Sequence, residues 1–321
     1  MKTHKILLTG AGGQIGIELT ARLREKYGRE AVLATDVQVS PVLDAGGPFE
    51  LLDVTDGKSL EALFAKFKPT QVYHLASLLS ATSERKPRLA WEVNVNGLLL
   101  VLEACRAHGS RLFWPSSIAV FGPNTPRIMT PQRTVIDPST IYGIGKLTGE
   151  RWCAYYKAKH GMDVRSLRYP GLISYAAFPG GGTTDYAVDI FFQAVQRGAY
   201  TCYLGPDTAL PMMYMDDAIR GTLELMEAPV EALKTEEGYN FAALSFTPAE
   251  LARAVQVQMP TFGMDYQMDE RQAIADSWPA SIDDRQARDE WGWKPRFDLP
   301  AIVSAMLEGV SRKLAETAER P

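Results

Sequence analysis

Short apolar runs and longer amphipathic stretches alternate along the first half of the chain. The apolar runs are typical of buried strands, and the stretches between them place apolar residues three or four positions apart, as helices do. Ile15, Leu19 and Leu23, for example, share one stripe. The pattern predicts strands at 5–10, 31–36, 70–76, 110–117 and 163–171, and helices at 13–27, 59–67, 87–108 and 141–161.

This alternation predicts an α/β fold, a doubly wound parallel sheet of the Rossmann type with helices on both faces. The rhythm breaks after Gly171, where loops surround a helix at 186–197 and another at 247–258. We expect an NAD-binding Rossmann domain at 1–171 and about 218–237. A smaller, non-contiguous C-terminal substrate lobe would take up about 172–217 and 238–321, over the sheet edge where ligands bind in such folds.

Composition narrows the class of protein. The chain has 321 residues, 46% hydrophobic and 22% charged, which is typical of a globular protein with a large core. The net charge of −4 and the lack of a Lys/Arg-rich block argue against nucleic acid or a membrane surface as a partner. Three scattered cysteines and no export signal favour a reducing cytoplasm without disulfides, and the four histidines form no zinc motif, so no metal is expected.

The segment TGAGGQIG (9–16) joins the first strand to the first helix. Gly10, Gly13 and Gly16 permit a sharp turn and let a pyrophosphate approach the free N–H groups of a helix N-terminus. Asp36 ends the second strand, where a carboxylate binds ribose hydroxyls and repels a 2′-phosphate, so NAD is expected rather than NADP. The alternatives are an ordinary tight turn and a solvated acid. Asp53 could accept from the adenine amino group, or it could be a helix N-cap.

Tyr142 and Lys146 stand four residues apart on the helix at 141–161, so their side chains share a face. An ammonium group beside the phenol, together with a positive nicotinamide ring, favours the phenolate and makes tyrosine a usable general base. Ser116 and Ser117 end the fourth strand, where a hydroxyl can hold a substrate oxygen. The alternative is an aromatic core residue with a solvated lysine.

These three motifs together resemble the extended short-chain dehydrogenase/reductase superfamily over nearly the full length of the chain. The resemblance selects Ser117 of S-I-A-V-F-G as the catalytic serine, Tyr142 as general base and Lys146 as the residue that binds ribose and tunes the tyrosine. It implies a homodimer built on helices 87–108 and 141–160. Cofactor contacts are expected at Gly10, Gly13, Gln14, Ile15, Gly16, Asp36, Asp53, Val54, Leu75, Ala76, Ser77, Asn94, Lys146 and Tyr169.

Most extended members act on nucleotide sugars and carry an arginine that grips the diphosphate. This chain has ALPMMYMDD (209–217) in the matching place, and residues 176–196 hold no Lys or Arg. The segments PGGGTTDYAV (179–188), LPMMYMDDAIRGT and SSIAVFGP instead resemble the short-chain-type L-threonine 3-dehydrogenases. That resemblance implies NAD-dependent oxidation of the L-threonine 3-hydroxyl in threonine catabolism.

The glycine loop at 179–185 offers a place for the zwitterionic amino acid. Thr184 or Asp185 is expected to cap the helix from Tyr186 to Arg197, whose N-terminal amides could receive a carboxylate. The alternative is a flexible surface loop. Candidate substrate contacts are Ser80, Ser117, Tyr142, Gly182, Thr183, Thr184 and Trp278. Two other functions stay open, a nucleotide-sugar epimerase or dehydratase of the same fold and a non-catalytic NAD-sensing protein.

Overall fold

The computed structural model describes residues 4–176 and 178–318, which form two compact units. The first unit comprises residues 1–120, 140–168 and 221–239, and the second comprises 121–139, 169–220 and 240–321. Each unit is therefore built from pieces that are not contiguous in sequence. Among the described residues, no helix is both long and apolar enough to cross a membrane.

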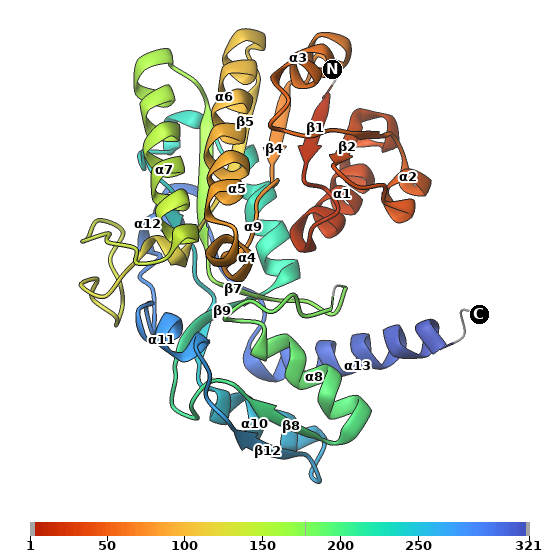
Figure 1. Cartoon of the computed structure of the whole chain (residues 1–321), viewed down its shortest axis with the longest axis vertical. Coiled ribbons are helices and arrows are strands. Elements are labelled where there is room, and N and C mark those ends of the chain that lie inside the picture. The colour runs from red at the N-terminus through yellow and green to blue at the C-terminus, as the bar shows by residue number, and fades with distance from the viewer. Residues whose placement is uncertain (1–3, 177, 319–321) are drawn as a thin grey trace. The chain divides into compact units, whose positions relative to one another are not determined.

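A seven-stranded sheet forms the centre of the first unit (Figure 1). In the order of pairing its strands are β10 (Tyr239–Asn240), β6 (Val164–Tyr169), β5 (Arg111–Ser117), β4 (Gln71–His74), β1 (Ile6–Thr9), β2 (Val32–Asp36) and β3 (Phe49–Leu51). The pairs from β3 through β2, β1 and β4 to β5 are parallel. The expected doubly wound Rossmann sheet is confirmed.

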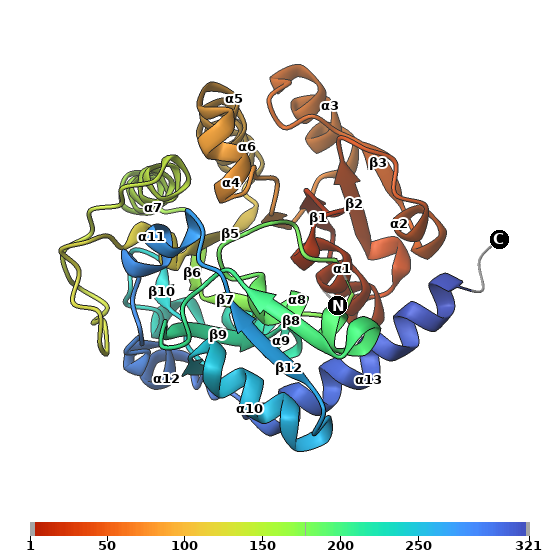
Figure 2. The same ribbon diagram turned by 60° about the horizontal axis from the view of Figure 1, so that its bottom comes forward.

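Helices cover both faces of this sheet. They are α1 (Gln14–Tyr27), α2 (Pro41–Gly46), α3 (Gly57–Phe67), α4 (Ser80–Arg85), α5 (Pro87–Trp91), α6 (Gly97–His108), α7 (Ile141–His160) and the end of α9 (Met215–Glu227). Figure 2 shows α3, α6 and α7 side by side along one face, where they pack on an apolar core. The ends of α1 and α9 are joined through Glu227, which accepts from Tyr27 and pairs with Lys26.

The long helix expected after Pro87 is continuous, but its hydrogen-bonding pattern changes along its length. The chain passes from α5 through a π-helical turn at Glu92–Asn96 into α6. Such π turns are uncommon and frequently occur at functional sites. Helix α7 has the expected bounds, because Thr140 caps its N-terminus by accepting from the Gly143 amide and Gly161 ends it in the left-handed conformation.

Within the described residues, two small sheets and a group of helices make up most of the second unit. One sheet has the order β11 (Leu244–Phe246), β9 (Leu210–Tyr214), β7 (Gly171–Ile173), and the other pairs β12 (Gly263–Tyr266) with β8 (Ala199–Cys202). Its helices are α8 (Tyr186–Arg197), α10 (Pro248–Gln258), α11 (Arg271–Asp276), α12 (Arg285–Trp291) and α13 (Leu299–Ala318). Helix α13 contacts both α8 and α10.

Candidate active site

The turn between β1 and α1 is packed too closely for any residue but glycine at two positions. Gly10 has φ +69°, and a Cβ there would lie 2.4 Å from the Ala76 amide nitrogen. A Cβ on Gly16 would lie 2.6 Å from the Gly10 carbonyl oxygen. Helix α1 begins at Gln14 without a side-chain cap, so its first amides face outward for an anion. This turn fits the pyrophosphate of a dinucleotide.

Asp36, at the end of β2, is held beside this turn. Its Oδ2 accepts from the Gly12 amide at 2.9 Å, and its Oδ1 accepts from the Gln38 amide at 3.2 Å. Each carboxylate oxygen can accept a second hydrogen bond, so the pair remains able to bind two ribose hydroxyls. The carboxylate therefore has a fixed orientation beside the β1–α1 turn.

Asp53 does not cap a helix, so that alternative was wrong. The N-cap of α3 is Asp56, whose side chain accepts from the amides of Lys58 and Ser59. Asp53 Oδ1 instead accepts from the amide and hydroxyl of Thr55. Its loop continues into Val54, which is buried.

Asn94 shapes the segment that follows β4. Its Oδ1 accepts from the Leu78 amide at 2.7 Å, and its Nδ2 donates to the Leu78 carbonyl at 3.0 Å. The asparagine lies in the π-helical turn and fastens the chain just beyond the expected cofactor contacts Leu75, Ala76 and Ser77. Ser80 is buried at the start of α4, a few residues further on.

Ser117, Tyr142 and Lys146 come together in the first unit, where the end of β5 meets the first turns of α7. The Ser117 and Tyr142 hydroxyls share a hydrogen bond, and Ser117 Oγ also accepts from the Ala119 amide. Lys146 Nζ donates to the Pro115 carbonyl at 2.6 Å and lies 5.4 Å from the centre of the Tyr142 ring. This is an arrangement in which a phenol can remove a proton from an alcohol that Ser117 steadies.

The two neighbouring serines have different partners. Ser116 is buried and donates to Glu150 Oε1 at 2.6 Å. Ser117 is half-buried and faces Tyr142. The structure therefore places Ser117, and not Ser116, beside the proposed base.

Burial dominates the proton affinities at this site. It raises the pKa of Tyr142 to about 12, against the opposing hydrogen bond from Ser117. It lowers the pKa of Lys146 to about 7, with Cys153 and Glu150 acting in the other direction. The sequence led us to expect that the ammonium and a positive nicotinamide ring together favour the phenolate, and here the Lys146 ammonium is directed at the Pro115 carbonyl. The charge of a bound cofactor is needed as well.

His74 is a buried histidine at the end of β4. Its Nδ1 is 2.6 Å from the Thr9 hydroxyl, and burial, with the nearby charge of Lys146, lowers its pKa to about 3. His74 is therefore neutral and adds no charge to the site.

The glycine loop of the second unit is tied together by Asp185. Its Oδ2 accepts from the amides of Gly180 and Gly182 at 2.7 and 2.8 Å. The Tyr203 hydroxyl donates to the Gly182 carbonyl at 2.9 Å. Asp185 holds the N-cap position of α8, as expected. Its side chain does not accept from the helix amides, however, because it turns back into the loop.

The first amides of α8 have partners within the chain. The Ala187 amide donates to the Thr184 carbonyl, and the amides of Val188 and Asp189 donate to the Asp185 carbonyl. The expectation of a helix N-terminus open to a carboxylate is wrong for these amides. Thr183 is buried and Thr184 is half-buried.

Tyr169 and Trp278 lie in the core of the second unit. The ring of Tyr169 packs edge-on against Phe241 at 5.6 Å between centroids. Trp278 is buried, and its carbonyl accepts from Arg127 Nε at 3.2 Å.

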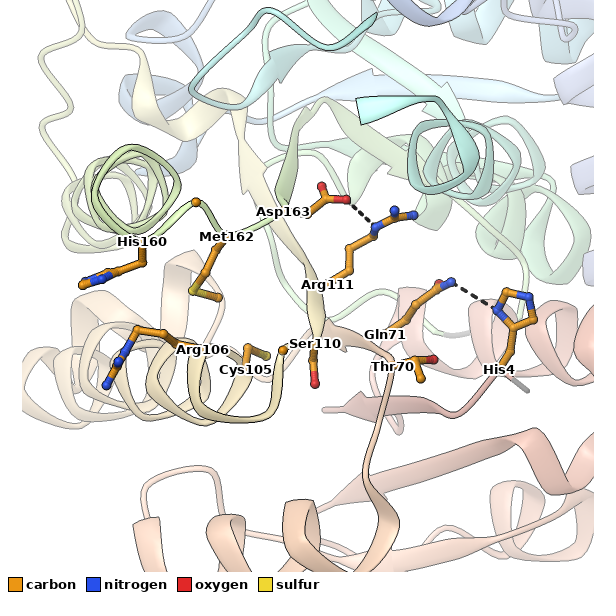
Figure 3. Close-up of a pocket in the computed structure, with 12 residues that line it drawn as sticks. His4, Thr70, Gln71, Cys105, Arg106, Ser110, Arg111, His160, Met162 and Asp163 are labelled. Carbon is orange, nitrogen blue, oxygen red and sulfur yellow. Dashed lines mark hydrogen bonds and ion pairs between the residues drawn. The ribbon is translucent and has the colours of Figure 1, made fainter. Parts of the chain in front are cut away.

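A cavity of about 770 Å³ opens where β4 and β5 of the large sheet begin (Figure 3). Gln71 and Arg111 line it at the starts of β4 and β5, whereas Ser117 ends β5. Its arginines already have partners, since Arg111 pairs with Asp163 at 2.5 Å and Arg106 pairs with Glu103. The cavity is therefore separate from the serine–tyrosine–lysine group.

Comparison with known proteins agrees with this geometry. Residues 6–242 match the profile of the NAD dependent epimerase/dehydratase family. A curated relative from Staphylococcus epidermidis, described as an uncharacterized epimerase/dehydratase, is 50% identical over 97% of this chain and 99% of its own length.

Two solved structures are similar over nearly the whole chain. The L-threonine dehydrogenase of Clostridium difficile is 46% identical with a TM-score of 0.95, covering 98% of this chain and 99% of that one. The holo form of a GalE-like L-threonine dehydrogenase from Cupriavidus necator is 53% identical with a TM-score of 0.93, covering 95% and 99%. The protein is an NAD-dependent oxidoreductase, as its motifs predicted. With its family profile, its fold and its close relatives in agreement, the chain belongs to the NAD dependent epimerase/dehydratase family.

Proposed function

We propose that this enzyme oxidises the 3-hydroxyl of L-threonine. L-Threonine and NAD⁺ give 2-amino-3-oxobutanoate, NADH and a proton. The observation that carries the proposal is the full-length similarity to two solved L-threonine dehydrogenases, at 46% and 53% identity. The Ser117–Tyr142–Lys146 group supports it, because alcohol oxidation needs a base at the hydroxyl.

In this proposal Tyr142 removes the hydroxyl proton while Ser117 donates to the developing carbonyl oxygen. Lys146 holds a positive charge beside the phenol and lowers the free energy of the phenolate once the cofactor is present. NAD supplies the acceptor for the hydride that leaves the β-carbon of threonine. The buried setting strengthens each of these interactions.

The residues proposed to hold NAD are those of the β1–α1 turn and the neighbouring strand ends. They are Gly10, Gly13, Gln14, Ile15, Gly16, Asp36, Asp53, Val54, Leu75, Ala76, Ser77, Asn94, Lys146 and Tyr169. Besides Ser117 and Tyr142, the residues proposed to contact threonine are Ser80, Gly182, Thr183, Thr184 and Trp278. The fixed loop geometry around Asp185 supports a role for the glycine segment.

A nucleotide-sugar epimerase or dehydratase is the competing function. Its diphosphate would need a cation, and the segment 209–217 contains none. The next arginine, Arg220, is engaged by the Asp217 carboxylate at 2.6 Å and by the Lys294 carbonyl. These observations favour L-threonine over a nucleotide sugar as the substrate. A non-catalytic NAD sensor is disfavoured by the assembled Ser117–Tyr142–Lys146 group.

The test is an absorbance assay at 340 nm with NAD and a panel of amino acids and UDP-sugars. We expect NADH to form with L-threonine and its formation to be unaffected by zinc chelators. In Tyr142→Phe the rate should fall by roughly 10²-fold or more. Turnover of a UDP-sugar without turnover of threonine would replace this proposal with the competing one. NAD binding without turnover of any compound would favour the sensor.

We also propose that the protein is a homodimer through α5–α6 and α7. Exposed apolar side chains on these helices, among them Leu89, Trp91 and Ile144, support this proposal. Light scattering after size exclusion measures the mass, and a monomer at micromolar concentration would refute it.

A further inference from the structure

A fully buried ion pair lies directly behind the proposed catalytic residues. Glu150 of α7 and Arg168 of β6 both have side chains with 0% exposure. Arg168 Nε donates to Glu150 Oε1 at 2.8 Å and Nη2 donates to Oε2 at 2.7 Å, a bidentate pair. A third donor, the Ser116 hydroxyl, binds Oε1 at 2.6 Å.

This pair is connected to the site through two elements. On α7, Glu150 follows Lys146 by four residues, which places the two side chains on one face. On β5, three successive residues are tied to α7: Pro115 accepts from Lys146, Ser116 donates to Glu150, and Ser117 meets Tyr142. The carboxylate is therefore the next charged group beyond the lysine on that face.

The backbone at Gly238 packs directly against the Glu150–Arg168 pair. A Cβ at residue 238 would lie 2.9 Å from Glu150 Oε1 and 3.2 Å from Arg168 Cγ, so only glycine fits there. The preceding residue, Glu237, accepts from Arg168 at 3.2 Å and from Arg151 at 2.6 Å. With so little water around it, the charge of Glu150 acts at longer range than a surface charge would.

A buried ion pair is not needed for stability, because two apolar side chains of similar size often serve equally well. We propose that Glu150 is a positioning residue for proton transfer: its carboxylate is the counter-charge that favours the protonated form of Lys146 against the effect of burial, and Arg168 limits the strength of that charge. The proposal rests on Tyr142 and Lys146 being the proton-transfer pair of the proposed function. It does not require threonine to be the substrate.

The neighbouring groups on β4, β5, α6 and α7 described next supply no negative charge to Lys146. His74 on β4 is neutral. On β5, the centre of the Trp114 ring lies 4.7 Å from Lys146 Nζ. The thiols of Cys153 on α7 and Cys105 on α6 stay protonated, because burial raises the pKa of each.

Carboxylates on the other packed elements have partners of their own. Glu84 of α4 accepts from the Ile141 amide, Glu103 of α6 pairs with Arg106, and Glu92 of the π-helical turn accepts from Asn96. Among the described carboxylates, Glu150 is the one whose charge raises the pKa of Lys146 against the effect of burial.

Two single variants change the charge at this position in opposite directions. Glu150→Gln removes a negative charge and leaves Arg168, so the potential at Lys146 and Tyr142 becomes more positive and both lose protons more readily. Arg168→Gln leaves Glu150 unneutralised and has the reverse effect. The double variant restores a neutral pair.

The first measurement is the pH dependence of turnover with whichever alcohol the enzyme oxidises. We expect the profile to move to lower pH in Glu150→Gln and to higher pH in Arg168→Gln, each on the order of one pH unit. The double variant should return close to the wild-type profile, and Glu103→Gln, on the surface of α6, should leave it in place. Shifts of the same sign in the two single variants, or none, would overturn the proposal.

The second measurement needs no substrate. The side-chain carbon-13 chemical shift of a lysine changes when it loses its proton, so the pH dependence of the Lys146 signal in lysine-labelled protein, assigned by comparison with Lys146→Met, reports its pKa. The midpoint should fall in Glu150→Gln and rise in Arg168→Gln. If threonine proves not to be a substrate, the proposed function fails while this measurement still decides the role of Glu150.

An unpaired buried charge can prevent folding. Glu237→Gln avoids this, because its carboxylate is a quarter exposed and binds the outer side of Arg168. It should lower the Lys146 midpoint by less than Glu150→Gln does. An unchanged Lys146 midpoint in folded Glu237→Gln contradicts the proposed coupling.

Discussion

Asp36 offers a direct test of how the cofactor is bound. Its carboxylate is held by the amides of Gly12 and Gln38, with capacity left for two ribose hydroxyls. A hydrogen bond to a charged group contributes about 1.5–3 kcal/mol, and water replaces part of that at this half-buried position. We expect Asp36→Ala to lose about 1.5–3 kcal/mol in total, so the Kd for NAD should rise roughly 10- to 100-fold.

NADP should respond in the other direction. Its 2′-phosphate would lie beside the carboxylate, and two like charges about 4 Å apart repel by about 4 kcal/mol near a protein surface. Removing the charge should therefore strengthen NADP binding while NAD binding weakens. Asp36→Asn removes the charge while keeping the size of the side chain and one of the two oxygens that accept from the Gly12 and Gln38 amides, so its effect on NADP mainly reports the charge.

Titration of tryptophan fluorescence with NAD and NADP measures both constants in the three proteins. Glu50→Ala is a matched control, since Glu50 lies on the neighbouring strand β3 and its carboxylate is paired with Lys66. An NAD/NADP ratio that is the same in wild type and Asp36→Ala would show that this carboxylate does not face the ribose.

Further outcomes follow from the same structure. Tyr142→Phe should lower turnover by roughly 10²-fold or more while NAD still binds, as for loss of a general base; near-normal kcat would point to another base. Because the pKa of Tyr142 is raised, turnover should increase with pH from neutrality to about pH 9; a flat profile would contradict this. Burial lowers the pKa of Lys146 to about 7, so the unfolded chain binds more protons above that pH. The unfolding free energy of the cofactor-free protein should thus rise between about pH 7 and 10 and do so less in Lys146→Met, as urea titrations can measure. Thr184→Ala should raise the KM for threonine by roughly 10-fold or more with unchanged NAD affinity. Gly181→Val should lower kcat as well, since Gly181 has φ +87°; wild-type kinetics in both would make this loop a spectator.

Local signals made the nucleotide turn and the catalytic group predictable. Three glycines at a strand–helix joint, an acid at the next strand end, and Tyr142 and Lys146 one helical turn apart are each specified by nearby residues. Helix α7 was predicted with its bounds because Thr140 and Gly161 define its ends. The fold followed from the alternation of strands and helices.

Other features depend on contacts between distant residues, which a single sequence does not display. Arg168 on β6 pairs with Glu150 on α7, and the sequence does not display this pairing. The position of Glu150 four residues after Lys146 was a signal that could have drawn attention to it. The π turn at Glu92–Asn96 fits an ordinary helical pattern. Asp185 looked like a cap, but its carboxylate found two loop amides five and three residues earlier.

The glycine that covers the Glu150–Arg168 pair also bears on how the protein is made. Gly238 belongs to the last segment of the first unit, and the chain reaches it only after residues 169–220 of the second unit. A ribosome-bound chain that stops at Arg168 has its catalytic helix and strand but lacks the backbone that shields their charges from water. The first unit can therefore complete its interior only once residue 239 has emerged. A contiguous fragment such as 1–168 is for this reason a poor stand-alone nucleotide-binding domain, and circular permutation or domain grafting should keep the 221–239 segment with it.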